Sequence, residues 1–318
     1  QILIHRDATG TVQKGLSLGG TRRLRLPIPD PKIQAYIGDK VRLAERCREE
    51  AGKVYGEGQK LLDSSLDLPA IQEQRSYGWF IEPSRDMLFG RLNAQTYKPY
   101  YTMASRYLLE RPDCHLLGDL IGNGGKDITG GATPLGASYP NEGIPFLRVQ
   151  NIQKNYLDLT DVVYIDHSTH SSMKRSQVKP YDIIFTITGY PGSATCVSPD
   201  LLPLNMNQHS VRFSIQRDKV DPFFMAAFLN SDYGYIQVKQ RATGATRDAL
   251  DYPSIKTILI PVLDLTLQKK IGHYFRQYAF YRRKSEKLIQ EAKSEVESLI
   301  EGDLDTKAIL SGTIYFPT

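Results

Sequence analysis

The sequence predicts an α+β protein in which a mostly β domain is joined to two long helices packed as an antiparallel coiled coil. Two observations lead to this fold class. The 318-residue chain repeats one stretch near both of its ends. The region between the two copies is rich in short β-branched and aromatic runs separated by turn residues. The length is sufficient for two domains.

The repeat relates residues 8–38 to residues 242–272 in a constant register without a gap. Matched positions include punctuating residues, such as the pair Gly38 and Gly272, as well as helix-forming ones. A repeat with so large a period indicates duplicated domains rather than a solenoid. The alternative is a chance similarity between two amphipathic helices.

Each copy continues into a long amphipathic segment. Apolar residues keep three- and four-residue spacing through most of residues 264–301, and a weaker stripe of the same kind runs through residues 30–65. A narrow apolar stripe with charges elsewhere is typical of a coiled-coil seam. Asp30 and Asp264 stand where each helix should begin, and a carboxylate there accepts hydrogen bonds from free backbone N–H groups. We therefore expect two long helices that pack on each other.

The region between these helices is predicted to be mainly strands and turns. Strands are expected in residues 144–152, 162–165, 182–188, 194–197 and 210–215, and one more precedes each long helix, in residues 22–28 and 256–262. Two helices are expected among them, in residues 166–177 and 221–240. Residues 63–79 are polar and rich in turn formers, which is typical of a linker.

The composition restricts the class of protein. The chain has 40 Lys and Arg against 35 Asp and Glu, a net charge of +5, which permits a polyanionic partner without requiring one. Cys47, Cys114 and Cys196 are odd in number and widely spaced, which favours buried thiols in a reducing cytosol over disulfides or a zinc site. No apolar run reaches the ~18 residues of a membrane span, and no signal peptide is visible. Because the sequence begins with Gln1 and not Met, we expect further residues before it.

Several segments resemble one protein family when they are taken in order. They read "GGATPLGASYPNEGIPFLRVQNI", "VKPYDIIFTITGYPGSATCV", "NMNQHS", "SDYGYIQVKQRATGATRDAL" and "TILIPVLDLTLQKKI". This order resembles the target recognition domain and following conserved helix of the specificity subunits of type I restriction–modification systems. "RLNAQTYKP" also resembles the segment that opens such domains. The resemblance covers residues 87–302, and the repeat extends it to residues 1–66.

Specificity subunits carry two recognition domains, each followed by a conserved helix, and this arrangement explains the repeat. The resemblance implies a C-terminal remnant of a first recognition domain in 1–29, a first conserved helix in 30–65, a linker in 66–86, a second recognition domain in 87–263, a second conserved helix in 264–301 and a tail in 302–318. Most of the first domain is missing from this sequence. It therefore stays open whether this chain alone reads a two-part site.

The resemblance also implies a function in phage defence, in the cytoplasm of a prokaryote. Such a subunit is not itself an enzyme: it binds double-stranded DNA and directs a partner adenine-N6 methyltransferase and a restriction (translocase) subunit to a bipartite site. S-adenosylmethionine and ATP are expected in those partners, and no cofactor or metal is expected in this chain. Three alternatives remain: the DNA-recognition tail of a single-chain methyltransferase–nuclease, a coiled-coil scaffold with a protein-binding β domain, and a divergent nuclease.

DNA recognition needs polar side chains on loops beside a rigid sheet, for contact with phosphates and base edges. The Gly-rich turn in residues 188–193 allows a close backbone approach, and Asn or Gln can bind adenine with two hydrogen bonds. The candidate DNA-binding residues are Lys126, Thr133, Tyr139, Arg148, Gln150, Asn151, Thr188, Gly189, Tyr190, Ser193, Asn205, Asn207, Gln208, His209, Arg241, Thr243, Thr246 and Arg247. The alternative for each is a structural turn, an amide cap or solvated surface.

Enzymatic motifs are incomplete in this sequence. "GNGGKD" in residues 122–127 is not a phosphate-binding loop, because Leu120 replaces the first glycine and Asp127 the Ser or Thr. His167 and His170 lack further ligands at a spacing suited to a metal. We find no amino-methyltransferase motif, no nuclease arrangement and no nucleophile elbow. Catalysis is therefore expected from a partner.

Overall fold

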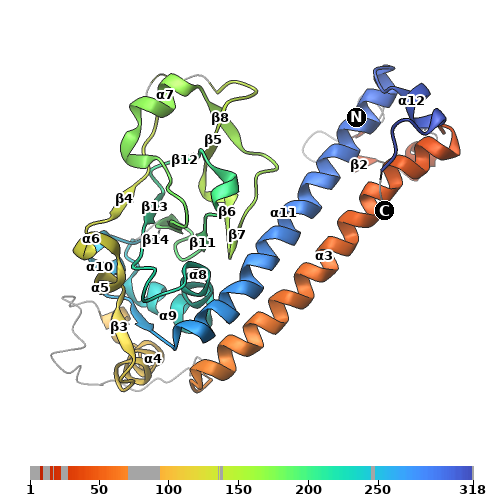
Figure 1. The fold of residues 1–318 in the computed structure, drawn as a ribbon. Coiled ribbons are helices and arrows are strands. Elements are labelled where there is room, and N and C mark those ends of the chain that lie inside the picture. Colours follow the sequence, from red (N-terminus) through yellow and green to blue (C-terminus); the bar gives the residue numbers. More distant parts are fainter. Residues whose placement is uncertain are drawn as a thin grey trace. The chain divides into compact units, whose positions relative to one another are not determined.

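The computed structural model describes residues 8–9, 15–16, 18–22, 28–70, 94–134, 136, 139–244 and 248–316 (Figure 1). Backbone contacts divide the chain into two units. The larger unit is Ala44–Lys287, and the smaller unit combines Gln1–Leu43 with Leu288–Thr318. Helices and short strands are both present, which confirms the α+β class. Among the described residues, no helix is long and apolar enough to cross a membrane.

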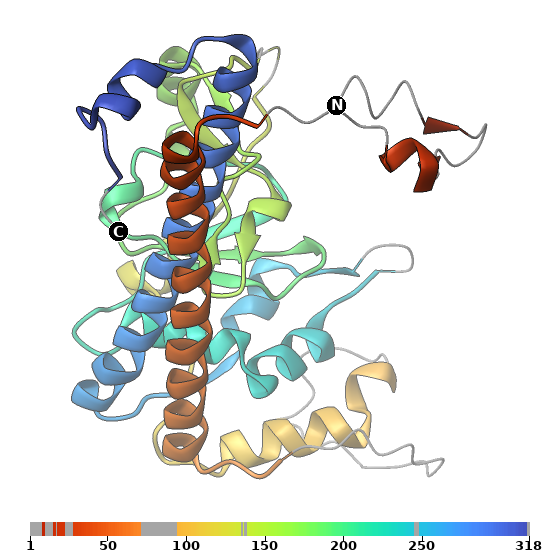
Figure 2. The ribbon, with the colours of Figure 1, turned by 90° about the vertical axis from the view of Figure 1, so that its right-hand side faces the viewer.

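The two long helices are α3 (Pro31–Leu66) and α11 (Leu265–Glu301), and each contributes to both units. In the larger unit, the Ser285 hydroxyl donates a hydrogen bond of 2.8 Å to the carbonyl of Ala44. Further along the same pair, the rings of Tyr55 and Phe275 meet edge to face with centroids 5.7 Å apart. Rising numbers on one helix thus meet falling numbers on the other, and Figure 2 shows the helices side by side. The predicted antiparallel pair is confirmed.

The smaller unit contains the same antiparallel pairing. The Tyr36 hydroxyl donates to Glu295 Oε1 over 3.1 Å, and Lys40 forms a largely buried ion pair with the same carboxylate. The short helix α12 (Thr306–Ser311) follows α11, and the Nζ of Lys32 donates to the carbonyl of Leu310 at its end (3.0 Å). These contacts surround a small apolar cluster that includes Ile37.

The helices begin where the sequence indicates. Asp264 Oδ1 accepts from the backbone N–H of Thr266 (2.9 Å), and Asp30 Oδ1 accepts from that of Lys32 (2.8 Å). These bonds satisfy N–H groups that have no partner within the helix. Gly58 is buried against α11, with the Cβ of Tyr274 only 2.8 Å from where a Cβ on Gly58 would stand. Helix α3 continues through its glycines, and Gly58 allows α11 to approach closely.

The β domain is built on a four-stranded antiparallel sheet with the order β11-β9-β13-β4. Its strands are β11 (Ala194–Cys196), β9 (Ile183–Thr186), β13 (Ser210–Phe213) and β4 (Ile128–Gly130). Phe185 belongs to a core cluster with helix α8 (Pro222–Asn230), all of whose residues are buried. Ile184, its neighbour, belongs to a different cluster with Leu147 and Met206. Alternate residues of the strands thus face two cores, as the pleat requires.

Smaller sheets and helices complete the domain. The remaining strands are β3 (Cys114–Leu116), β5 (Ile144–Leu147), β6 (Ile152–Gln153), β7 (Tyr156–Leu157), β8 (Val163–Ile165), β10 (Thr188–Gly189), β12 (Asn205–Met206), β14 (Asp248–Ala249) and β15 (Leu259–Pro261). They pair as β12-β5-β8, β6-β7, β10-β14 and β15-β3. The remaining helices are α4 (Pro99–Leu109), α5 (Leu117–Leu120), α6 (Gly122–Gly125), α7 (His167–Ser172), α9 (Asp232–Arg241) and α10 (Tyr252–Lys256).

Some expectations at the level of single elements are wrong. The helix expected in residues 221–240 is divided into α8 and α9, because the Ser231 hydroxyl accepts the Gly234 N–H (3.3 Å) and begins a second helix. The expected strand in residues 22–28 is not observed at its start, since Arg22 ends helix α2 (Leu18–Arg22). The linker expected from residue 63 begins later than predicted, because α3 continues to Leu66. Residues 23–27, and the part of the expected linker beyond residue 70, lie outside the described residues.

Candidate nucleic-acid interface

Several candidate loops are joined by hydrogen bonds at one end of the sheets. The Thr133 hydroxyl, which follows β4, donates to Gln208 Oε1 over 2.6 Å. The Asn207 carboxamide oxygen accepts the N–H of His209 (3.2 Å) and fixes this polar loop. The His209 carbonyl accepts the N–H of Ile187 (3.0 Å), directly before β10. The polar loop in residues 207–209 therefore adjoins both the loop after β4, which carries Thr133, and the start of the Gly-rich turn.

The Gly-rich turn in residues 188–193 is held by one buried hydroxyl. Thr186 Oγ1 donates to the carbonyl of Tyr190 and accepts the N–H of Ser193, each over 2.9 Å. Gly189 and Gly192 have φ values of 84° and 116°, which disfavour any residue with a Cβ. The Tyr190 side chain is 85% exposed. The turn thus presents an aromatic ring and backbone to solvent from a fixed base.

Thr243 reaches the same surface through strand pairing. Its N–H donates to the carbonyl of Ala249 (2.9 Å), and the Ala249 N–H donates back (2.7 Å). Strand β14 pairs in turn with β10, where Thr188 lies opposite Ala249. We call Thr133, residues 188–193, residues 207–209 and Thr243 the loop cluster. Thr246 and Arg247, also predicted from the sequence, lie outside the described residues.

The prediction of DNA contact is wrong for three residues, because their side chains are buried and bonded to partners inside the domain. Arg241 is 1% exposed, and its guanidinium donates to the hydroxyl (2.9 Å) and carbonyl (2.8 Å) of Thr257. Asn205 is buried beside the ring of His170, with its amide nitrogen 3.3 Å from Nδ1. Asn151 is buried and donates to Asp161 Oδ1 over 3.0 Å. These side chains support the fold and do not reach its surface.

The predicted strand ends at Leu147, so Arg148 precedes a 3-10 turn (Val149–Asn151) and Gln150 lies within it. Arg148 donates to the carbonyl of Asp161 (2.6 Å), and Gln150 donates to its Oδ2 (3.0 Å). Both side chains retain some exposure but are tied to this aspartate. Tyr139 is 51% exposed, and its ring stacks at a tilt on Phe146 (6.2 Å). All three remain candidate DNA-binding residues, although they are not part of the hydrogen-bonded loop cluster.

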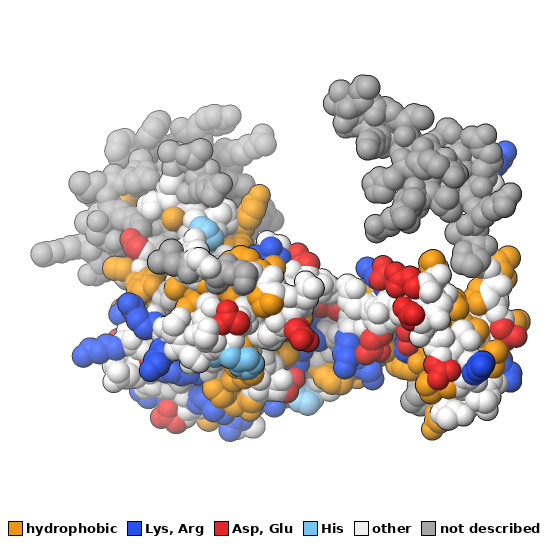
Figure 3. Space-filling view, turned by 90° about the horizontal axis from the view of Figure 1, so that it is seen from above, with side chains coloured by type: hydrophobic (Ala, Val, Ile, Leu, Met, Phe, Trp, Pro, Cys, Tyr) orange, Lys and Arg blue, Asp and Glu red, His pale blue; other side chains and the backbone are white. Residues whose placement is uncertain are grey.

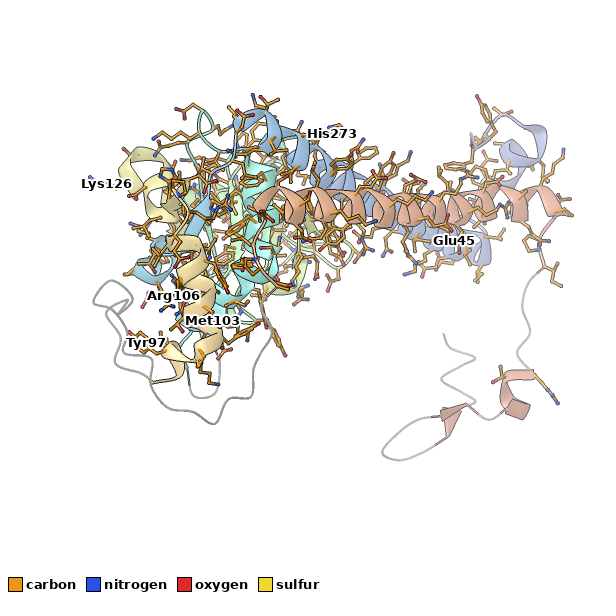
Figure 4. The ribbon with its side chains drawn as sticks, turned by 90° about the horizontal axis from the view of Figure 1, so that it is seen from below. Glu45, Tyr97, Met103, Arg106, Lys126 and His273 are labelled. Carbon is orange, nitrogen blue, oxygen red and sulfur yellow. The ribbon has the colours of Figure 1, made fainter. Side chains whose placement is uncertain are left out.

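Lys126 does not join the loop cluster. It follows α6 and precedes β4, whereas Thr133 follows β4, so the two lie at opposite ends of this strand. Figure 4 shows Lys126 projecting outward at the edge of the β domain. Its neighbour Asp127 belongs to an ion-pair network with Lys179 (3.1 Å) and the buried Arg212 (3.4 Å). Burial alone would raise the pKa of Asp127, but these cations hold that pKa below its usual value.

The described part of the surface seen from above carries charges of both signs. Figure 3 shows Lys and Arg side chains interspersed with apolar and neutral ones on the face seen from above. Within the described ranges, no group of three or more His, Cys, Asp or Glu side chains is placed to hold a metal ion. The His170 imidazole, one of the two histidines considered for a metal, has its pKa lowered by burial and by His167. What the loop cluster offers a ligand is hydroxyls, amides, an exposed ring and close backbone approach.

Comparison with known proteins supports the resemblance seen in the sequence. No family model matches the chain. A curated relative, the type I restriction enzyme EcoBI specificity subunit of Escherichia coli, is 26% identical over 163 residues. The match covers 51% of this chain and 34% of the relative, so it spans about a third of that protein's length. The expected likeness to type I specificity subunits is confirmed by this match.

Solved structures of the same class align with most of the chain. The S subunit of the type I restriction–modification system from M. genitalium is 14% identical, with a TM-score of 0.49, covering 93% of this chain and 68% of that one. The HsdS subunit from Thermoanaerobacter tengcongensis is 15% identical, with a TM-score of 0.40, covering 95% and 68%. The likeness to specificity subunits therefore rests on the sequence match to the curated relative, and not on these structural alignments.

Proposed function

We propose that this chain, a relative of type I restriction-enzyme specificity subunits, is a non-catalytic DNA-recognition subunit. It binds double-stranded DNA and directs a partner adenine-N6 methyltransferase, and a restriction subunit, to a bipartite site in a prokaryotic cytoplasm. Methyl transfer and translocation use S-adenosylmethionine and ATP bound by those partners. The two long helices set the distance between the parts of the site.

The loop cluster is the observation that carries this proposal. Three polar segments far apart in the sequence, around Tyr190, Gln208 and Thr243, are fixed next to one another on a sheet with a well-packed core. Rigid elements hold contacting groups more precisely than free loops do. Hydroxyl and amide groups match the hydrogen-bonding edges that base pairs present in the major groove. The exposed side chain of Gln208 is the candidate for reading a base.

Selection from random duplexes tests this proposal. The chain is purified with its methyltransferase, and bound DNA is recovered and sequenced over several rounds. We expect enrichment of one gapped motif. Gln208→Ala should weaken binding to that motif about 10- to 100-fold, because a good bidentate contact contributes ~1–3 kcal/mol of discrimination. Gln59→Ala, on α3, is the matched control and should bind as the wild type does. Failure of a folded, assembled complex to enrich any motif would contradict the proposal.

A further inference from the structure

A second surface lies next to the loop cluster. None of its residues is among the DNA-binding candidates predicted from the sequence. Tyr235 lies on the outer face of α9 and is 41% exposed. The Nζ atoms of Lys154 and Lys239 each lie 5.5 Å from the centroid of its ring. An ammonium within about 6 Å of an aromatic centroid is attracted to the ring. We call Lys154, Tyr235 and Lys239 the lysine–tyrosine platform.

Lys154 is positioned by a turn that is fixed to the base of the Gly-rich turn. It stands between β6 and β7, next to Asn155, whose N–H donates to the carbonyl of Ala194 over 2.9 Å. The Asn155 carboxamide oxygen also accepts from Asn230 of α8 (2.8 Å). Ala194 directly follows the Gly-rich turn. The exposed Lys154 is therefore held beside that turn by buried hydrogen bonds.

Lys239 is connected to the other strand of the loop cluster. Its Nζ pairs with Asp248 Oδ2 over 3.2 Å, and Asp248 lies opposite Gly189 in the β14–β10 ladder. The Gly-rich turn also packs directly on α9, since a Cβ on Gly192 would lie 3.2 Å from Val238 Cγ1. The platform thus lies next to the turn that carries the exposed Tyr190.

The charge on this platform is only partly compensated. Asp248 offsets Lys239, but among the described residues no carboxylate forms an ion pair with Lys154. Both ammonium groups surround one ring, so they lie no more than twice 5.5 Å apart. Phosphates follow one another along each strand of DNA with a rise of ~3.4 Å. Because the phosphates also wind around the helix axis, their separation exceeds this rise, and the span between the two lysines suits neighbouring phosphates of one strand.

We infer that the lysine–tyrosine platform binds the phosphate backbone of one DNA strand beside the Gly-rich turn. Lys154 and Lys239 contact phosphates, and the Tyr235 ring holds their flexible side chains over that backbone. Contacts of this kind set the position of the protein on DNA and carry no sequence information. The inference rests on the proposed function, since it assumes that the loop cluster faces DNA.

The test is the salt dependence of DNA binding by the chain assembled with its methyltransferase. Fluorescence anisotropy gives the affinity for the selected motif and for an unrelated duplex at several salt concentrations. Lys154→Ala removes one phosphate contact, so the slope of log affinity against log salt should become shallower by about 0.9. It should weaken binding to both duplexes by a similar factor. Lys154→Arg should restore the wild-type slope.

Two controls keep the result interpretable. Lys60→Ala removes an exposed lysine of α3 and should leave the slope unchanged. Tyr235→Ala should weaken binding to both duplexes, whereas Tyr235→Phe, which keeps the ring, should not. An unchanged slope in Lys154→Ala, with specific binding intact, would overturn this inference alone. If the wild-type complex prefers no duplex over another, the proposed function falls and the inference falls with it.

Discussion

At the scale of single residues, Glu286 on α11 is a partly buried carboxyl near the β domain whose pKa is strongly raised. Burial raises its pKa to about 7, and the nearby Asp158 adds to the shift. Arg282, whose Nη2 lies 3.3 Å from Glu286 Oε1, opposes it, as does Arg283. Arg282 also donates to the hydroxyl of Tyr156 on β7 over 2.8 Å. A carboxyl with a raised pKa thus lies where α11 meets the β domain.

This shift predicts a pH-dependent stability. The folded state holds the Glu286 proton more tightly than the unfolded state, in which this carboxyl has its ordinary pKa of 4.5. The free energy of unfolding should therefore fall as pH rises from about 5 to about 7, and level off above. Glu286→Gln should remove this fall and be more stable than the wild type near pH 8, by roughly 1–3 kcal/mol.

Chemical denaturation across this pH range measures the difference. Glu297→Gln changes an exposed carboxyl of the same helix and serves as the control, with a pH profile parallel to that of the wild type. Parallel profiles for wild type and Glu286→Gln would show that Glu286 titrates as an ordinary surface carboxyl.

The candidate contact residues could be predicted from the sequence only in part. Residue type identified the polar loop, and Gln208 and Tyr190 are indeed exposed. Residue type did not reveal that Asn205 and Arg241 point inward, because their partners, His170 and Thr257, come from other elements. Polar side chains are buried when such partners exist, and only the tertiary structure supplies them.

At the scale of elements, the contact between α3 and α11 depends on a small residue. A Cβ on Gly58 would stand 2.8 Å from the Cβ of Tyr274 and 3.2 Å from Phe275 Cε2. Gly58→Ala should therefore force the helices apart and lower the free energy of unfolding by about 1–3 kcal/mol. Gly52→Ala, with no atom within 4 Å of the added group, should instead raise it by about 1 kcal/mol through helix propensity.

Denaturation midpoints of these two variants distinguish packing from propensity. The same substitution in the same helix should lower the free energy of unfolding at Gly58 and raise it at Gly52. An increase in stability for both would mean that Gly58 does not face α11 and that the helices pair differently.

Periodicity and residue type predicted the long helices and the strands β5, β8, β9, β11, β13 and β15, but not β4 of the central sheet. Residues 182–188 and 210–215 contain β9 and β13, and the stripe in residues 264–301 forms α11. The break between α8 and α9 was missed, although Ser231 is a favourable N-cap, because apolar residues on both sides hide it. Helix α4 was not predicted either, since its aromatic residues also suit a strand.

At the scale of the whole molecule, the repeat has a physical counterpart in local structure. Gln34 donates to the carbonyl of Pro29 (2.8 Å), and Gln268 donates to that of Leu263 (2.7 Å). Gln268 also accepts the N–H of Asp221 (3.0 Å), which joins α11 to the β domain. The two copies thus share the way their helices begin and differ in what packs against them.

The proposed function requires the β domain to direct methylation to a defined DNA sequence. The most direct measurement is single-molecule sequencing of DNA from cells that express this chain together with its methyltransferase. We predict N6-methyladenine at one gapped motif, and its loss when Tyr190 and Gln208 are both replaced by Ala. A bound and active methyltransferase that leaves no defined motif methylated would contradict the proposed function and favour a scaffold role.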